Sequence, residues 1–351
     1  MGANCLRDGT GRVRPRSMSS SAPSRLPDIL CIGAAHWDVI GHTARTVRPG
    51  ADLPGKVLRQ PGGVAMNLAL GLARQLPASA TGPGLLAALG DDALAQALLA
   101  LCAKAGIDTT GVLRMPGRRT DSYVAIEGAD GLVAAIADTA TQETAGAAIL
   151  TPLSDGEWRG VAVIDGNLSP ETLAAAAGML GHARLCLVAA SPHKARRLTP
   201  LLRLPHATLY ANRAEAEMIC GRTFHDSLQA AHALIDMGLS RALVTDGAAP
   251  VTDLQASDGP DGAANGHLRP CTATPQPMVP RPANDGATRA FTGAGDRFAA
   301  AHIAAVIAGL EAPEALAKAL AAASTPAPSL LDTVEFPPPE RRQYEEPAEH
   351  D

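Results

Sequence analysis

The sequence predicts an α/β fold: a doubly wound, mostly parallel sheet flanked by helices, with a small β-sheet that covers the site as a lid. Two patterns predict it. Between residues 84 and 244, short apolar runs alternate with Ala- and Leu-rich helical segments, an order that calls for parallel strands joined by right-handed crossovers. Two other stretches, about 43–60 and 113–138, do not fit a helical layer and are expected to form the lid.

The elements follow each other along the chain. Residues 28–35 read as a buried first strand that runs into a glycine turn, with Asp38 just past its end. Residues 120–138 alternate apolar and polar side chains around the turn 128–131, which is typical of a hairpin. Further strands are expected at 84–89, 161–164, 185–189, 207–210 and 242–244, and helices at 92–105, 170–180, 193–202, 213–220, 226–238 and 298–310.

One domain is expected, over residues 28–330. The leader 1–27 is polar and Ser-rich and lacks the apolar stretch of a secretory signal, and residues 331–351 are rich in Pro and charge, so both are expected to be disordered. Residues 253–288, rich in Gly, Pro, Asp and Asn, predict a long irregular connection with at most short strands.

The composition argues for a small-molecule partner. The 351-residue chain is 46% hydrophobic and carries a formal net charge of −5 with scattered basic residues, so it can bury a sizeable core but lacks the charge of a nucleic-acid binder. No apolar run approaches the ~20 residues of a membrane span. The widely spaced cysteines include no C-x-x-C pair and are expected to be reduced thiols of a cytoplasmic protein, none of them a nucleophile: Cys5, Cys31, Cys102, Cys186, Cys220 and Cys271.

The densest chemical signal is T-G-A-G-D at 292–296, followed by an apolar helical run to residue 310. Small residues at a helix start leave backbone N–H groups open, and the helix dipole adds partial positive charge, so the segment predicts an anion cradle. Such a cradle stabilises the charge of phosphoryl transfer, and Asp296 at its edge can accept the proton of an attacking hydroxyl. Alternatively, the glycines make a tight turn and Asp296 only caps the helix. The spacing is not that of a Walker A loop.

Polar side chains also follow other predicted strands. Asp38 follows the first strand, and Asn167 follows the strand at 161–164. Ligands of open parallel sheets bind beyond the carboxyl ends of the strands, so both are expected near a substrate. Each can instead be an ordinary turn residue.

Over roughly residues 28–330 the chain resembles the PfkB or ribokinase-like family of carbohydrate kinases. The segment similar to the C-terminal signature of that family is Gly293-Ala294-Gly295-Asp296. The resemblance implies a ribokinase-like fold and a kinase that uses ATP with Mg²⁺. It also implies that Asp296 is the catalytic base and that Gly293, Ala294 and Gly295 form the anion hole.

The N-terminal signature of the family is a Gly-Gly pair followed by an Asn that opens a helix, and residues 61–69 are similar to it. By this resemblance Gly62, Gly63 and Asn67 bind the substrate. The glycines let a hydroxylated molecule approach the backbone, and the Asn67 amide offers both a donor and an acceptor. Asp38 stands where these kinases usually place a carboxylate that takes two substrate hydroxyls.

Residues 212–215, N-R-A-E, match the N-x-x-E motif of the family. The resemblance implies that Asn212 and Glu215 orient the phosphates and the water shell of Mg²⁺, an ion that usually keeps several waters. Without the other motifs, Asn followed three residues later by Glu is simply a capping box.

Residues 244–247, V-T-D-G, resemble the T-x-G turn that meets the nucleotide phosphates and ribose. The resemblance therefore implies that Thr245 and Gly247 contact the nucleotide. Asp246 adds a negative charge beside this turn and is expected to point to solvent.

Other positions depart from the family pattern. Ala290 and Phe291 stand where an acidic residue usually helps to hold a monovalent cation, which argues against K⁺ activation. Arg297 replaces a small residue, and its guanidinium either reaches a phosphate or forms a surface ion pair. Val64 replaces a lysine of typical ribokinases, which argues against ribose.

Within the family, residues 31–41 and 163–169 look most like pseudouridine kinases of bacterial type. The 5′ hydroxyl of pseudouridine is therefore the favoured acceptor. His36 or Trp37 can contact its base or serve only in packing. Ribose, fructose, adenosine and inosine stay open, as does a non-catalytic ligand sensor on the same fold. Lid strands often pair between two subunits in this family, so a homodimer through the lid is a further expectation.

Overall fold

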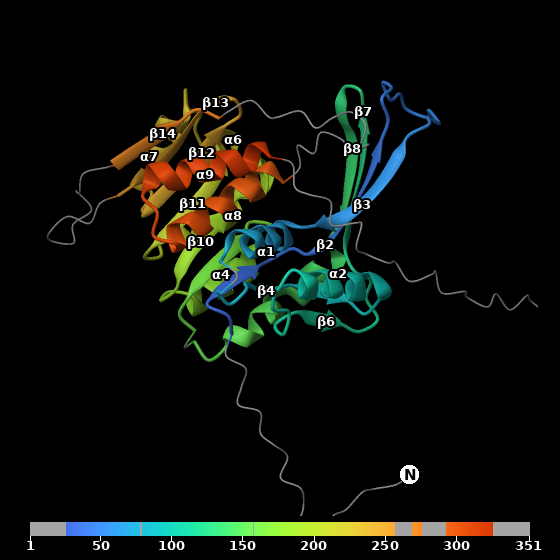
Figure 1. The fold of residues 1–351 in the computed structure, drawn as a ribbon, viewed down its shortest axis with the longest axis horizontal. Coiled ribbons are helices and arrows are strands. Elements are labelled where there is room, and N and C mark those ends of the chain that lie inside the picture. The colour runs from blue at the N-terminus through green and yellow to red at the C-terminus, as the bar shows by residue number, and fades with distance from the viewer. Residues whose placement is uncertain (1–25, 78, 157, 257–268, 276–292, 326–351) are drawn as a thin grey trace, which may run out of the picture.

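A computed structural model describes residues 26–77, 79–156, 158–256, 269–275 and 293–325. The expectations for the leader up to residue 25, for the tail 331–351 and for most of the connection 253–288 lie outside these ranges. Within them, helices cover a large sheet, and a smaller sheet projects from its edge (Figure 1). No helix of the described ranges is long and apolar enough to cross a membrane.

The large sheet confirms the predicted doubly wound, mostly parallel arrangement. Its eight strands run in the order β14-β13-β12-β11-β10-β9-β1-β4. The pairs β12–β13 and β13–β14 are antiparallel, and all other neighbours are parallel. The strands are β1 (Ile29–Ile32), β4 (Gly84–Leu86), β9 (Val161–Asp165), β10 (Arg184–Val188), β11 (Ala207–Asn212), β12 (Arg241–Asp246), β13 (Ala249–Gln255) and β14 (Arg269–Ala273).

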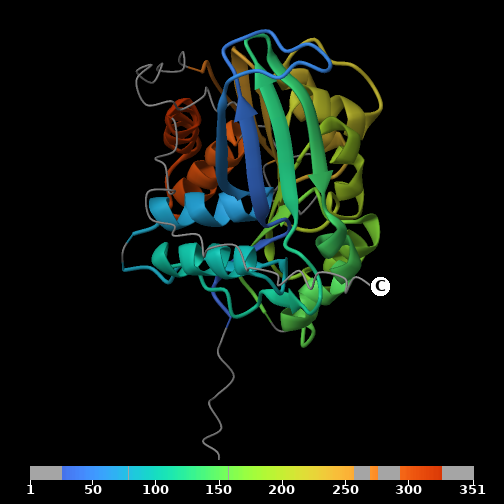
Figure 2. The same ribbon diagram turned by 90° about the vertical axis from the view of Figure 1, so that its right-hand side faces the viewer.

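The strands of the large sheet pack against two helical layers, because successive side chains of a strand point to opposite faces. Leu30 and Ile32 join one core, whereas Ile29 and Cys31 join the other. Figure 2 shows helices on both sides of the sheet. The first core includes α3 (Ala140–Ala145), η1 (Gly146–Leu153), α4 (Pro170–Met179), α5 (Pro192–Ala195), η2 (Arg196–Leu201), α6 (Arg213–Cys220) and α7 (Ser227–Asp236), and the second includes α1 (Val64–Gln75), α2 (Ala93–Lys104), α8 (Ala294–Ile307) and α9 (Ala312–Ser324).

Helix starts follow local capping chemistry. Side-chain oxygens of Asp92, Asn212 and Asp226 each accept the N–H three residues further on, at 2.8–2.9 Å, and so begin α2, α6 and α7. Helices α1 and α8 instead begin at Gly63 and Gly293, whose φ values are +94° and +80°. Among the described residues no side chain caps these two helices. In α1 the Met66 N–H donates to the Ala34 carbonyl at 3.2 Å, whereas the first N–H groups of α8 have no partner among the described residues.

The projecting sheet is the predicted lid, with altered boundaries. Its order is β3-β2-β7-β8, formed by β2 (His36–His42), β3 (Lys56–Gly62), β7 (Ser122–Gly128) and β8 (Gly131–Asp138). The expected hairpin is confirmed, since Gly128 pairs with Gly131 across its turn. The lid stands apart from the helical layers in Figure 1.

Asp38 does not lie in a turn past the first strand. It lies within β2, because the chain leaves the main sheet after β1 and pairs at once with β3 and β7. The segment 84–89 is likewise two strands rather than one: β5 (Ala88–Gly90) leaves the main sheet and pairs with β6 (Leu113–Met115). Residues 113–121 therefore lie outside the lid.

The helix expected at 193–202 is the short helix α5 followed by the 3₁₀ segment η2. Pro200 lies inside η2, lacks an N–H and disfavours an α conformation at the residue before it. Helix α8 begins at Ala294, four residues before the expected start at 298. Helix α9, which packs on α8, was not predicted.

A buried polar network, also not predicted, ties α8 to three strands. Arg241 Nε donates to Asp253 Oδ1 at 2.7 Å, and Asp253 Oδ2 lies 3.5 Å from Nε2 of His302 on α8. The His302 side chain is fully buried, and this burial, with Arg241 nearby, lowers its pKa and keeps it neutral. The Tyr210 hydroxyl lies 2.9 Å from His302 Nδ1, and Arg241 Nη2 lies 3.3 Å from His302 Nε2, so both ring nitrogens have polar partners.

Removal of the Asp253 carboxylate leaves the buried Arg241 guanidinium without its counter-charge. We expect Asp253→Ala to lower the free energy of unfolding by about 3–5 kcal/mol, measured by urea titration. The matched control is Asp91→Ala, which breaks the exposed pair with Arg114 and is expected to change stability by less than about 1 kcal/mol. Equal effects of the two substitutions would contradict a structural role for the network.

Candidate active site

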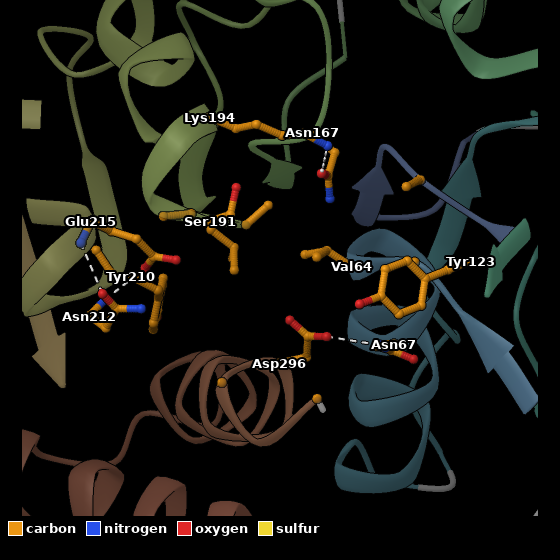
Figure 3. A pocket seen from close by; sticks show the side chains of 18 of the residues that line it. Val64, Asn67, Tyr123, Asn167, Ser191, Lys194, Tyr210, Asn212, Glu215 and Asp296 are labelled. Carbon is orange, nitrogen blue, oxygen red and sulfur yellow. Dashed lines mark hydrogen bonds between the residues drawn. The ribbon is translucent and has the colours of Figure 1, made fainter. Parts of the chain in front are cut away.

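A cavity of about 510 Å³ opens between the lid and the carboxyl ends of the parallel strands. The N-termini of α1, α6 and α8 meet there, and Figure 3 shows polar side chains from these helices and from the lid around one space. Most of the predicted site residues line it: Asp38, Gly63, Asn67, Asn167, Asn212, Glu215, Thr245, Gly293, Gly295 and Asp296. Gly62, Ala294 and Gly247 lie within two residues of this set without lining the cavity.

Asp296 lies at the uncapped start of α8. Its Oδ2 accepts a hydrogen bond of 2.8 Å from Asn67 Nδ2, which joins the first turns of α1 and α8 although the two residues are far apart in sequence. The first bond within α8 runs from Arg297 N–H to the Gly293 carbonyl, so earlier N–H groups have no partner inside the helix. A Cβ at Gly295 would meet nothing within 4 Å, which leaves space for a ligand.

Burial raises the pKa of Asp296 to about 7. The hydrogen bond from Asn67 and the charge of Arg297 lower it, whereas the carboxylates of Asp165 and Asp38 raise it further. A carboxylate with a pKa near neutrality is suited to exchange protons at physiological pH. Arg297, expected to reach a phosphate or a surface partner, donates from Nη2 to the Ala323 carbonyl of α9 at 3.3 Å.

The glycine pair at 62–63 holds Asp38 in place. A Cβ on Gly62 would lie 2.0 Å from Asp38 Oδ1, and a Cβ on Gly63 would lie 2.3 Å from the Ala34 carbonyl oxygen. The glycines are therefore required by the packing of this chain as well as by any approach of a ligand. The buried Asp38 carboxylate also lies 3.2 Å from Nε2 of His36.

Asp165 is a site residue that the sequence reasoning passed over. It is fully buried, and its two oxygens accept the N–H groups of Ala34 at 2.9 Å and Asn167 at 2.7 Å. A Cβ on Gly33 would lie 2.3 Å from Asp165 Cβ, so only glycine lets the loop after β1 come this close. Burial raises the pKa of Asp165, and the two N–H donors lower it.

Asn212 and Glu215 form the capping box and also line the cavity. Asn212 Oδ1 accepts the Glu215 N–H at 2.9 Å, and Glu215 Oε2 accepts the Asn212 N–H at 2.8 Å. The two interpretations of the motif are thus compatible. Glu215 is 6% exposed, and its burial raises its pKa to about 7; the Asn212 N–H lowers this pKa and the charge of Asp296 raises it.

These carboxylates fit a hydrated cation better than a directly bound one. Among the described residues, no cluster of three His, Cys, Asp or Glu side chains could hold a metal ion. Glu215 and Asp296 are close enough to interact. Without a nearby positive charge, the ionised form of each carboxylate is less favourable, relative to its protonated form, than it would be in water. Mg²⁺ usually keeps several waters and takes only one or two carboxylates besides phosphate oxygens, so this pair suits it.

Thr245, at the end of β12, lines the cavity beside Asn212, with which it pairs. Asp246 does not simply point to solvent as expected. Its Oδ1 accepts a hydrogen bond of 2.9 Å from Arg213 Nε, and this arginine also contacts Glu217 at 2.8 Å. The Arg213 guanidinium neutralises the Asp246 charge beside the turn that ends in Gly247.

Further cavity residues were missed, among them Tyr123, Ser191, Lys194 and Tyr210. Ser191 follows the end of β10 as Asn167 follows β9, so the rule that ligands bind beyond strand ends could have found it. Tyr123 faces the cavity because it pairs with Asp38 across the lid, a register that the sequence does not reveal. Ala290, Phe291 and Thr292 lie outside the described residues, so the absence of K⁺ activation stays a prediction.

Two carboxylates with raised pKa values predict a pH dependence of stability. Between their unfolded pKa of about 4 and their folded pKa of about 7, the folded chain holds protons that the unfolded chain releases, so stability falls as pH rises through this window. We expect Asp296→Asn and Glu215→Gln to be about 1–2 kcal/mol more stable than wild type at pH 8, with little difference near pH 4.

Urea titrations at both pH values measure this difference. Asp236→Asn, at an exposed carboxylate ending α7, is the control and is expected to leave stability nearly unchanged. A destabilised Asp296→Asn protein at pH 8 would contradict the proposed origin of the raised pKa.

Known proteins resemble this chain in sequence and in fold. Residues 26–327 match the family described as pfkB family carbohydrate kinase. Pseudouridine kinase of Escherichia coli is 30% identical over 195 residues, an alignment that covers 55% of this chain and only 61% of that enzyme. A carbohydrate kinase of Agrobacterium tumefaciens has a TM-score of 0.65 at 28% identity, over 85% of this chain and 90% of its own.

The Arabidopsis thaliana ribokinase solved with ribose and ATP shares the fold. Its TM-score is 0.64 at 20% identity, over 86% of this chain and 92% of its own. The sequence match extends over nearly the whole described region, and the fold is ribokinase-like throughout. The chain therefore belongs to the pfkB family of carbohydrate kinases, phosphotransferases with an alcohol group as acceptor.

Proposed function

We propose that the protein transfers the γ-phosphate of ATP to a hydroxymethyl hydroxyl of a sugar or nucleoside bound in the cavity. The observation that carries this proposal is the position of Asp296. A carboxylate with a pKa of about 7 lies at the uncapped N-terminus of α8, hydrogen-bonded to Asn67 and open to the cavity. A base and an anion cradle side by side are what hydroxyl phosphorylation requires.

The chemistry follows from these groups. Asp296 takes the proton of the acceptor hydroxyl as its oxygen attacks the γ-phosphorus and the bond to the ADP oxygen breaks. The open N–H groups at 293–295 face the oxygens of the transferring group, where the helix dipole also favours negative charge. Asp38, buried at the base of the lid, accepts hydrogen bonds from other hydroxyls of the acceptor.

The nucleotide is assigned to the other end of the cavity, near Asn212, Thr245 and Gly247. Glu215 holds Mg²⁺ through its waters, and the ion when bound neutralises phosphate charge. The two carboxylates with raised pKa values support this assignment, since a nearby dication favours their ionised forms. We place the protein in the cytoplasm, because all five cysteines of the described residues are free thiols.

Pseudouridine is the acceptor we favour, phosphorylated on its 5′ hydroxyl. The support is the 30% identity to the pseudouridine kinase of Escherichia coli together with a cavity that is partly aromatic, through Tyr123 and Tyr210. Val64 lines the cavity where typical ribokinases carry a lysine, which disfavours ribose. Uridine, adenosine, inosine, ribose and fructose are the acceptors to compare.

The test is ADP release with each of these acceptors, with and without K⁺. We expect the highest kcat/KM with pseudouridine and no requirement for K⁺. Asp296→Asn is expected to lower kcat by about 10²–10⁴-fold with ATP affinity unchanged, since only the base is removed. Asp236→Asn is the control. A wild-type rate in Asp296→Asn would refute the assignment, and ligand binding without ADP release would indicate a sensor.

We further propose that the lid pairs with the lid of a second copy. Asp38 and Tyr123 are paired on the face toward the cavity, so Val124 and its neighbour Ile136 point the other way. That outer face is apolar and exposed: Val57 is 74%, Ile136 71%, Ile126 47% and Val124 43% exposed. An exposed apolar face of this kind marks an interaction site, and a two-fold axis makes it self-complementary.

Light scattering after size exclusion tests this pairing. We expect a dimer for the wild type and a monomer for the double variant Val57→Glu, Ile136→Glu, because two charges on the outer lid face oppose its burial. Lys318→Glu, on the exposed side of α9, is the control that stays dimeric. A monomeric wild type at tens of micromolar would exclude the dimer.

A further inference from the structure

Asn167 is held from several directions by charged residues. Its N–H donates to Asp165 at 2.7 Å, and its carbonyl oxygen accepts from Arg197 Nη1 at 3.0 Å. Asp165 is fully buried and also accepts the N–H of Ala34, so its carboxylate is fixed in position. The backbone at residue 167 is therefore rigid, and only the side-chain amide has freedom left to lose.

Lys194 removes that freedom. Its Nζ lies 2.7 Å from Asn167 Oδ1, as the dashed line in Figure 3 shows. An ammonium group has three donors and no acceptor, so the amide atom that faces it must be the oxygen. The NH₂ side of the amide is consistent with this assignment. The Asn167 side chain lowers the pKa of Asp165, as a hydrogen-bond donor toward a carboxylate does. The orientation of this amide is chemically determined.

Toward the cavity, the side chains of Asn167 and Lys194 consequently offer donors only. Asn167 and Lys194 both line the cavity. The Asn167 NH₂ group has two hydrogens, of which Asp165 takes at most one, and Lys194 has two more beyond its bond to Asn167. Burial and the neighbouring charge of Arg197 lower the pKa of Lys194, while Asp165 and Glu143 raise it.

This wall is remote from the reacting hydroxyl. In Figure 3 Lys194 and Asn167 lie on the opposite side of the cavity from Asp296 and Asn67. Groups placed there meet a part of the acceptor that is not phosphorylated. They can select among acceptors without taking part in the transfer of phosphate.

We propose that Lys194 is a specificity-determining residue. By holding the Asn167 amide so that its NH₂ group donates, it selects acceptors that place a carbonyl-type oxygen at this wall over acceptors that place an amino group there. The inference rests on the proposed function only in that the cavity binds the phosphate acceptor. A carbonyl oxygen satisfies a donor here, whereas an amino group presents a second donor and leaves both groups unpaired. Nucleosides with an oxo-pyrimidine base are the chemical class that fits.

Calorimetric binding to the intact protein tests the proposal without requiring turnover. Two ligand pairs exchange one carbonyl oxygen for an amino group: uridine with cytidine, and pseudouridine with pseudoisocytidine. We expect the wild type to bind the carbonyl member at least about tenfold more tightly in at least one pair. Lys194→Met removes the ammonium donors and leaves the amide oriented through Asp165 alone, so this ratio is expected to fall to within about threefold.

Three further variants make the result specific. Lys194→Arg keeps a donor-only group and is expected to preserve the preference, and Lys318→Met, on the exposed side of α9, should leave the ratio unchanged. Asn167→Asp replaces the donor by an acceptor and is expected to abolish the preference. Thermal melts of every variant confirm folding, and a variant that fails to fold is replaced by Lys194→Gln.

The outcomes separate this inference from the kinase proposal. Any of three results overturns the role of Lys194. The wild type shows no preference in either pair, the wild type binds none of the four ligands, or the preference survives in Lys194→Met. Each of these can occur while ADP release with a sugar stands. Conversely, a preference lost in Lys194→Met without any ADP release supports this inference and refutes the kinase.

Discussion

The carboxylate of Asp165 is the contact on which the site depends. It is buried at the carboxyl end of β9 and binds the N–H groups of Ala34 and Asn167, which belong to different loops. Ala34 in turn accepts the N–H of Met66 in the first turn of α1 at 3.2 Å. The next residue of that helix, Asn67, donates to Asp296. One buried acid thus links the ends of β1 and β9, through α1, to the start of α8.

The same cavity concentrates negative charge. Asp38, Asp165, Glu215 and Asp296 come together with little solvent, and burial raises the pKa of Asp165, Glu215 and Asp296. A phosphorylated ligand adds to this charge, so the site needs compensating positive potential. The open start of α8 supplies part of it, and a hydrated dication suits the remainder. Such an arrangement lowers folding stability and gives Asp296 a pKa near neutrality.

The lid strands place side chains on two opposite surfaces. Alternation along β2 and β7 directs Asp38 and Tyr123 inward, and the same alternation directs Val124 outward. The inward face completes the cavity, while the outward face carries exposed apolar side chains. The Lys194 and Asn167 pair lies at the far wall, so the cavity has two walls of different chemistry.

By itself the sequence determined the elements and the local chemistry of the helix starts. The alternation of apolar and helical runs predicted the parallel sheet, and the segments 212–215 and 292–296 predicted the starts of two helices, because helix starts use residues close in sequence. Only the tertiary structure decided that Asp38 lies in a lid strand, that Lys194 orients Asn167 and that His302 joins α8 to Asp253. These contacts join residues of different elements, and their geometry is set by strand register and packing, which no local pattern encodes.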